Sequence, residues 1–305
     1  MTHSLPTFEP LTGYYEPSAI QQLPDGRFLV VEDEKDHSFS LLALSAGGEV
    51  SRKALEPGWF KGGDPIWKLD DLEGLTLDDA GHFYAITSHS RNDDGQTQKH
   101  RDKLARFRMD EHRLTDAVVV DGLKDALVAA HPVLAAAARV REAKSAQGFN
   151  IEALDITPDG QRLLVGFRSP LQGHQAIIAA IDNPADLFDA KVSPLISPTL
   201  HLLDLDGHGV RGLSHVPALN GYLVISGPVS RADTAFGLWF WSGNTTAARR
   251  VTVAGLAGFE HAEGVCPAII DGVPKIMLVS DDGNRKQKRF AHFVLLDLAQ
   301  LQIAD

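Results

Sequence analysis

The chain has almost no cysteine and no long apolar run. Cys266 is the single cysteine among 305 residues, so no disulfide can form within the chain, which fits a reducing compartment. No window approaches eighteen consecutive apolar residues, which excludes a membrane-spanning helix. The first residues show no basic stretch followed by an apolar run, the pattern of a secretory signal. We therefore expect a soluble, cytoplasmic protein without a membrane partner.

Basic residues are also scarce, because Lys and Arg number 29 against 40 Asp and Glu, a formal charge of -11. This balance argues against nucleic acid as a partner. The chain further lacks a phosphate-binding glycine-rich loop, a nucleophile elbow and a paired-cysteine metal site. Its 44% hydrophobic and 23% charged residues are an ordinary globular mixture, which excludes wholesale disorder.

What the sequence does contain is an internal repeat. Five segments share a charged residue, then a small residue or proline, then a short apolar run, and they start at Glu16, Glu73, Glu152, Arg211 and Glu263. A turn follows each segment, and four of the five turns contain Asp-Gly or Asn-Gly, which supply the positive φ angles of tight hairpins. A second apolar run then ends in a polar cluster. Each repeat therefore begins with a β-hairpin.

Third and fourth β-rich runs complete most repeats, and four short antiparallel strands in roughly 40–55 residues are typical of a propeller blade. A β-sandwich is the alternative, but it does not require the same opening residue and strand-end cluster five times. We predict an all-β protein, a β-propeller of five blades in one domain over residues 1–305. Six blades would follow if the longest gap between repeats hides another.

That gap contains the clearest helical passage. Leu123, Leu127 and Leu134 recur at helical spacing, and Pro132 interrupts the pattern. The sequence predicts a helical insertion of two short helices around residues 121–146. The last repeat lacks a fourth strand, so we expect the N-terminal segment to pair there and close the ring.

At the repeat positions the chain resembles an uncharacterised bacterial propeller family, a domain of unknown function grouped with phytase-like and esterase-like propellers. The resemblance spans roughly residues 16–299 and rests on the starts Glu73-Gly74-Leu75, Glu152-Ala153-Leu154, Arg211-Gly212-Leu213 and Glu263-Gly264-Val265, with strand ends such as Ser226-Gly227-Pro228 and Ser280-Asp281-Asp282. Repeated Glu-Gly starts are also similar to those of calcium-dependent nucleotidase propellers, where such glutamates ring a central calcium. Arg211 departs from that pattern.

The innermost strand of each blade lines the central channel, so the five repeat starts should converge at one mouth. Like charges there raise one another's pKa unless a cation compensates them. We therefore predict a Ca²⁺ site, because carboxylate oxygens are ligands that calcium prefers. The expected metal ligands are Glu16, Glu73, Glu152 and Glu263. In the alternative interpretation these glutamates only bond neighbouring blades together.

A basic residue follows the second strand of each repeat, in a chain that is acidic overall. Arg91, Arg168, Arg231 and Arg285, together with Arg211 at the mouth, predict a positive rim for a phosphate or carboxylate ligand. Each loop alone could simply be solvated.

For chemistry, His89 and Asp281 are candidates for proton transfer and Arg168 for holding substrate charge. His89 has the alternative role of an ordinary hydrogen-bonded loop histidine. The sequence thus supports a calcium-assisted hydrolase of a phosphate or other ester. The alternatives are a non-catalytic propeller that binds a small anion or peptide, and a protein-interaction scaffold. The oligomeric state stays open.

Overall fold

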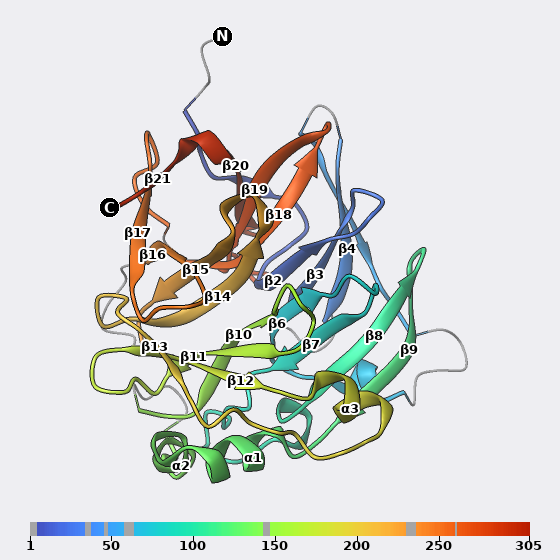
Figure 1. Ribbon diagram of the computed structural model, residues 1–305. Coiled ribbons are helices and arrows are strands. Elements are labelled where there is room, and N and C mark those ends of the chain that lie inside the picture. The colour runs from blue at the N-terminus through green and yellow to red at the C-terminus, as the bar shows by residue number, and fades with distance from the viewer. Residues whose placement is uncertain are drawn as a thin grey trace.

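The computed structural model describes residues 5–33, 38–45, 48–57, 64–142, 147–229, 236–259 and 261–305. The strands form five antiparallel sheets arranged as a five-bladed β-propeller (Figure 1). Within each blade the strands follow one another outward from the axis. The predicted all-β propeller is confirmed, and a sixth blade is not needed.

Each blade begins with an innermost strand that contacts the innermost strands of both neighbouring blades. Blade 1 is β2 (Pro17–Gln22), β3 (Phe28–Glu32), β4 (Phe39–Leu44) and β5 (Val50–Ala54). Blade 2 is β6 (Leu72–Leu77), β7 (Phe83–Thr87), β8 (Leu104–Asp110) and β9 (Arg113–Val120). Blade 3 is β10 (Asn150–Ile156), β11 (Leu163–Ser169), β12 (Ala176–Ile181) and β13 (His201–Leu203). Blade 4 is β14 (Gly209–Val216), β15 (Gly221–Gly227), β16 (Gly237–Trp241) and β17 (Ala248–Val253), and blade 5 is β18 (Ala262–Ile270), β19 (Val273–Ser280) and β20 (Ala291–Asp297).

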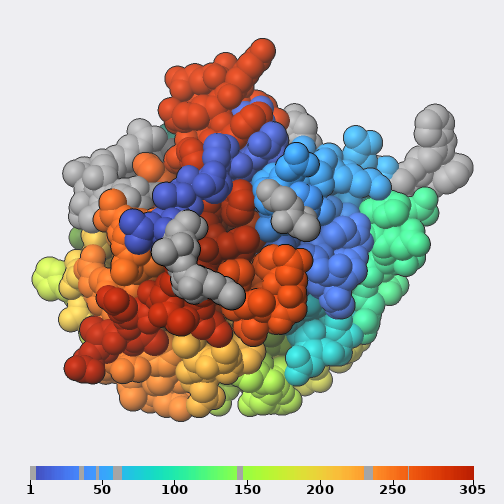
Figure 2. Space-filling model, turned by 90° about the horizontal axis from the view of Figure 1, so that it is seen from above, coloured from blue at the N-terminus to red at the C-terminus, as the bar shows by residue number. Residues whose placement is uncertain are grey.

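Both chain ends complete sheets that other segments begin. β1 (Glu9–Leu11) pairs antiparallel with β20 and becomes the fourth strand of blade 5, as predicted. β21 (Leu301–Ile303) crosses back to pair with β17, so blade 4 has a fifth strand that the sequence did not predict. In Figure 2 the blue N-terminal segment lies directly against the red C-terminal blade. The ring is therefore closed by hydrogen bonds between segments from opposite ends of the chain.

The helices lie in the connections between strands. α1 (Leu123–Ala130) and α2 (Pro132–Ala138) meet at Pro132 and bury Leu123, Leu127 and Leu134 against blades 2 and 3. These two helices lie where the helical insertion was expected, although residues 143–146 of that insertion fall outside the described residues. The other helices are α3 (Pro184–Asp189), η2 (Pro65–Lys68), η3 (Lys99–Arg101), η4 (Pro217–Leu219) and η5 (Leu298–Gln300). Among the described residues, no helix is long and apolar enough to cross a membrane.

Apolar side chains fill the space between neighbouring blades. Five buried clusters can be distinguished, one at each blade–blade contact. The cluster between blades 5 and 1, for example, joins Leu11, Phe28, Cys266 and Met277. Because alternate strand residues point to opposite faces, each blade contributes to two clusters, which explains why its central strands are apolar on both sides.

A β-bulge interrupts every innermost strand near its start. The pairing with the second strand shifts between Pro17 and Ala19, and at the corresponding place in the other four blades. The five residues at these bulges are Ser18, Glu73, Glu152, Arg211 and Glu263. A bulge re-aims the side chain of its extra residue, so this one geometry turns five side chains toward the axis.

The small residue after each bulge has a packing reason. A Cβ atom at Gly212 would lie 2.1 Å from the carbonyl oxygen of Glu263, and one at Gly74 would lie 2.7 Å from the backbone nitrogen of Leu154. At these two positions the adjacent blades approach too closely for any side chain, whereas alanine follows the bulges of blades 1 and 3. This register also corrects the alignment of the first repeat. Ser18, not Glu16, occupies the position of the other four starts, because the shift in β2 falls two residues later.

Candidate functional site

A cavity of about 380 Å³ opens at the end of the channel where the innermost strands begin. We call it the axial cavity. Its described lining comprises the five bulge residues and Asp33, Asp71, Ser90, Arg91, Asn92, Asp93, Arg101, Asn150, Arg168 and Asp281. Seven of these side chains are carboxylic acids and four are guanidinium groups, so the fully ionised lining carries three excess negative charges.

Arg211 lies among the acidic bulge residues. Its Nη1 atom is 2.6 Å from Oε2 of Glu152, and its Nη2 atom donates to Oε1 of Glu263. Burial lowers the pKa of Arg211, but the surrounding carboxylates outweigh burial and raise it above the usual value. Glu152 also accepts from Nη1 of Arg168 at 3.1 Å. Two of the predicted metal ligands are therefore already paired with arginine.

A second group of carboxyls on blades 1 and 2 is arranged differently. Carboxylate oxygens of Asp33, Asp71 and Glu73 lie within 4.8 Å of one another. Asp71 is held in place because its Oδ2 atom accepts from Ser88, from Ser90 at 3.2 Å and from Arg101 at 3.1 Å. We call Asp33, Asp71 and Glu73 the acidic triad, and its oxygen-only donor set could hold a metal ion such as calcium.

Two members of the acidic triad, Asp33 and Glu73, have raised pKa values. Burial, together with the adjacent Asp71, raises the pKa of Asp33 to about 9. Burial and four neighbouring carboxyls raise the pKa of Glu73 well above its ordinary value. Among the described residues, no hydrogen-bond donor contacts the Glu73 carboxyl. A bound cation would remove the reason for these shifts, because it favours the ionised forms.

Asp281 and Glu263 complete the acidic side of blade 5. Burial raises the pKa of Asp281 well above its usual range, with Glu263 adding to the effect and Arg211 opposing it. Burial also raises the pKa of Glu263 to about 7, although Arg211 contacts it directly. Burial and the like charge of Glu263 therefore both favour the protonated form of Asp281.

The predicted basic residues are only partly brought together. Arg91 and Arg168 line the axial cavity, where Arg91 also donates to the carbonyl oxygens of Gly95 and Ala138, each at 3.1 Å. Arg285 is not among the lining residues. Its guanidinium lies 4.2 Å from the centre of the Tyr15 ring and 3.8 Å from Glu32. Arg231 lies outside the described residues.

His89 and Glu16 are also absent from the described lining of the axial cavity. His89 is buried, with Nδ1 2.8 Å from the carbonyl oxygen of Thr87 and Nε2 3.2 Å from Asp102. Burial lowers the pKa of its imidazole. Glu16 is close enough to raise the pKa of both Asp33 and Asp281.

Sequence reasoning did not single out Asp71, Arg101 or Asn150, which all line the axial cavity. Asp71 stands two residues before the repeat start Glu73, and three acids within positions 70–73 were the available signal. Arg101 lies in the loop between β7 and β8. Its neighbours Lys99 and Lys103 are also basic, so from the sequence Arg101 could not be distinguished from a solvated basic run.

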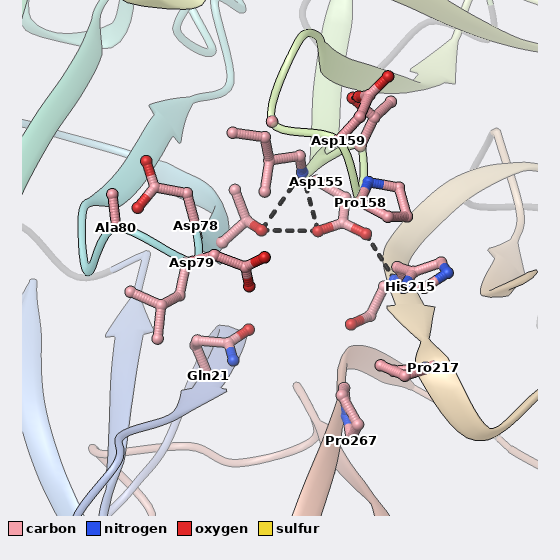
Figure 3. A pocket seen from close by; sticks show the side chains of 16 residues that line it. Gln21, Asp78, Asp79, Ala80, Asp155, Pro158, Asp159, His215, Pro217 and Pro267 are labelled. Carbon is pink, nitrogen blue, oxygen red and sulfur yellow. Dashed lines mark hydrogen bonds between the residues drawn. The ribbon is translucent and has the colours of Figure 1, made fainter. Parts of the chain in front are cut away.

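The opposite mouth of the channel holds a different cavity of about 410 Å³, shown in Figure 3. Its buried Asp155 accepts from Thr76 at 2.6 Å and from the backbone nitrogens of Ile156 at 2.9 Å and His215 at 2.5 Å. These bonds join blades 2, 3 and 4. Asp155 thus performs the blade-bonding role that was the alternative for the glutamates, at the other end of the axis.

Comparison with solved structures finds distant likenesses. They include a proposed oxidoreductase (glucose dehydrogenase) from Thermus thermophilus, 16% identical with a TM-score of 0.49 over 95% of this chain and 100% of that one. The PQQ-bound aldose sugar dehydrogenase of Streptomyces coelicolor is 15% identical, with a TM-score of 0.43 over 95% and 98%. An auxiliary nutrient binding protein from Bacteroides thetaiotaomicron is 11% identical, with a TM-score of 0.40 over 93% and 70%. Likeness at this level says nothing about ligands.

No curated protein matches the sequence. One family model matches residues 134–297, which is more than half of the chain and includes the bulges of blades 3, 4 and 5. The chain belongs to this uncharacterised propeller family, described as protein of unknown function (DUF3616).

Proposed function

We propose that the axial cavity binds a divalent cation at the acidic triad and uses it, with the adjacent arginines, to hydrolyse a small phosphate or other ester. The observation that carries the proposal is the excess of carboxyl over guanidinium groups in the lining of one cavity, together with a Glu73 carboxyl that has no donor among the described residues. Calcium suits this site best, because the described lining offers oxygen ligands and neither histidine nor cysteine.

The roles of the residues follow from their charge. A bound divalent cation would orient the ester and polarise its scissile bond. Arg91 and Arg168 line the same cavity and supply positive charge for the oxyanion of the ligand. Arg211 pairs with Glu152 and Glu263, and Arg168 also pairs with Glu152, which weakens the repulsion of an anion by these two carboxylates.

Asp281 is the proton donor in this proposal. Water attacks the phosphorus or carbonyl carbon, the bond to the leaving oxygen breaks, and that oxygen takes the proton of the Asp281 carboxyl. The attacking water then returns a proton to Asp281, so the carboxyl ends as it began. The raised pKa of Asp281 provides the protonated form that this step needs.

The proposal is tested by metal analysis of the purified protein, followed by melting curves in Ca²⁺, Mg²⁺, Zn²⁺ or EDTA. A panel of chromogenic phosphate, phosphodiester and carboxylester substrates then tests the chemistry. Glu73→Gln should fold and lose most of the calcium-induced rise in melting temperature, because that rise follows the ratio of free ligand to its dissociation constant. Asp159→Asn, a variant at the opposite mouth, is the control and should respond as the wild type does.

The second candidate is capture of a small anion or peptide without chemistry. It is favoured by the arginine pairs, which leave Glu152 and Glu263 with no free role in proton transfer. Saturable, calcium-dependent binding of inorganic phosphate without turnover of any ester would support this candidate over the hydrolase. If Glu73→Gln is less stable than the wild type but responds to calcium in the same way, the hydrolase and the binding protein are both contradicted. The protein-interaction scaffold would then be the remaining interpretation.

A further inference from the structure

A cavity of about 390 Å³ lies beside α2 and contrasts with the axial cavity in its chemistry. We call it the apolar cavity. Its described lining includes no charged side chain and is mostly aliphatic, with Val133, Ala136, Val140, Pro170, Leu171 and Val229. The described lining of the axial cavity, by contrast, consists of polar and charged side chains.

Neighbouring segments of the chain line the two cavities, although the described linings have no residue in common. Arg168 contacts Glu152 within the axial cavity, and its Nε atom donates to the carbonyl oxygen of Pro228 at 3.1 Å. Pro170, two residues after Arg168, and Val229, next to Pro228, line the apolar cavity. The end of β11 therefore places Arg168 in the lining of the axial cavity, and the residues that directly follow this strand line the apolar cavity.

A second connection runs through the helical insertion. Arg91 lines the axial cavity and donates to the carbonyl oxygen of Ala138 at the end of α2. A small hollow of about 10 Å³ shares Arg91 with the axial cavity and shares Ala137 and Val140 with the apolar cavity. The insertion thus brings an aliphatic helix face to the rim of the charged site.

We infer that the ligand of the axial cavity is amphiphilic, an anionic ester whose aliphatic arm lies in the apolar cavity along α2. The inference rests on the proposed function, because the axial cavity must hold the charged head. Ligand sites generally combine a few placed charges with a larger apolar lining. The axial cavity supplies the charges and the apolar cavity supplies the lining.

The test is calorimetric titration of methyl, butyl and hexyl phosphate into the protein in the presence of Ca²⁺. Affinity should rise about fourfold for each methylene that becomes buried. Ala136→Glu places a carboxylate in the apolar cavity at an exposed position of α2, where glutamate is a good helix former. It should abolish the dependence on chain length and leave the affinity for methyl phosphate unchanged.

Ala135→Glu is the matched control, because Ala135 lies on the same helix and is not among the described lining of the apolar cavity. It should retain the chain-length dependence. Leu171→Glu, on the facing wall, is a second test variant whose result does not depend on α2. Circular dichroism and melting curves establish that each variant is folded.

The outcomes separate the two proposals. If methyl phosphate binds but hexyl phosphate binds no more tightly, or if neither cavity variant changes the hexyl affinity, the aliphatic arm is wrong and the proposed function stands. If no phosphate binds in the presence of Ca²⁺, the proposed function fails and the inference fails with it.

Discussion

Replacing Arg211 by Gln should destabilise the protein more than any other single charge removal in the axial cavity. The guanidinium is buried and contacts two carboxylates from different blades, Glu152 and Glu263. Gln keeps much of the shape but removes the positive charge. Breaking a buried ion pair by removing one partner costs about 3–5 kcal/mol, because the other charge is left buried without compensation.

The lower end of that range applies to Arg211→Gln. Arg168 still contacts Glu152 at 3.1 Å, so only Glu263 loses its arginine partner entirely. Glu263 can also take up a proton, since burial already raises its pKa to about 7. We therefore expect a loss of about 3 kcal/mol in the free energy of unfolding at pH 8. The loss should be smaller at pH 5, where the carboxyls can be protonated.

The assay is urea unfolding with EDTA at both pH values. Arg250→Gln is the matched control, because it breaks the exposed pair between Arg250 and Asp206, whose side chains are 53% and 60% exposed. An exposed pair contributes about 0–1 kcal/mol, so the control should unfold almost as the wild type does. Added calcium should stabilise Arg211→Gln more than the wild type, because the guanidinium no longer occupies a place for a cation. Equal unfolding midpoints for Arg211→Gln and Arg250→Gln in EDTA would refute the account of the arginine as an internal counterion.

Three further predictions concern the opposite mouth, the closure and His89. Burial raises the pKa of Asp155 to about 7 from 3.8. As pH rises above about 4, the Asp155 carboxyl loses its proton in the unfolded chain but keeps it in the folded protein until about pH 7. The free energy of unfolding of the wild type should therefore fall by up to about 4 kcal/mol over this pH range. Asp155→Asn should lack that decline in urea titrations across pH, and a parallel decline would contradict the assignment. Deleting residues 301–305 removes β21, the strand that pairs with β17, and should lower the free energy of unfolding by about 2 kcal/mol. The rise in melting temperature caused by calcium should not change. A deletion variant with the melting temperature of the wild type would show that this pairing does not stabilise the ring. His89→Gln should reduce stability but leave ester hydrolysis and calcium binding intact, because Nδ1 of the imidazole contacts the carbonyl oxygen of Thr87, Nε2 lies 3.2 Å from Asp102, and His89 is not in the described lining of the axial cavity. A selective loss of turnover would reinstate its catalytic role.

The blade count could be predicted because it depends on local patterns, and the closure could be predicted because the last repeat lacked a fourth strand. Each hairpin has its own turn residues. The N-terminal segment belonged to no repeat, and the sheet of the last repeat was the one that still lacked a strand. The fifth strand of blade 4 could not be predicted, because β21 is three residues long and pairs with a strand about 50 positions away. Strand pairing over such a distance has no signature in a short sequence window.

The repeat starts were expected at one end of the channel, but the first repeat was misaligned. The charged-then-small pattern marks a β-bulge, and a bulge shifts the register by one residue. In blade 1 the bulge residue is the uncharged Ser18, so the charged residue Glu16, two positions earlier, was aligned with the other starts. Glu73 was predicted as a metal ligand, but its partners Asp33 and Asp71 were not, because they come from different blades and only the closed ring brings them together.

The central claim is that a cation binds at the acidic triad, and an anomalous diffraction experiment tests it most directly. Crystals grown in Ca²⁺, or in Mn²⁺ as a stronger anomalous scatterer, would be compared with crystals grown in EDTA. The account predicts an anomalous peak in the axial cavity, about 2.3–2.6 Å from oxygens of Asp33, Asp71 and Glu73 for calcium. A fully ordered axial cavity without such a peak at millimolar calcium, or a peak only at the opposite mouth, would contradict it.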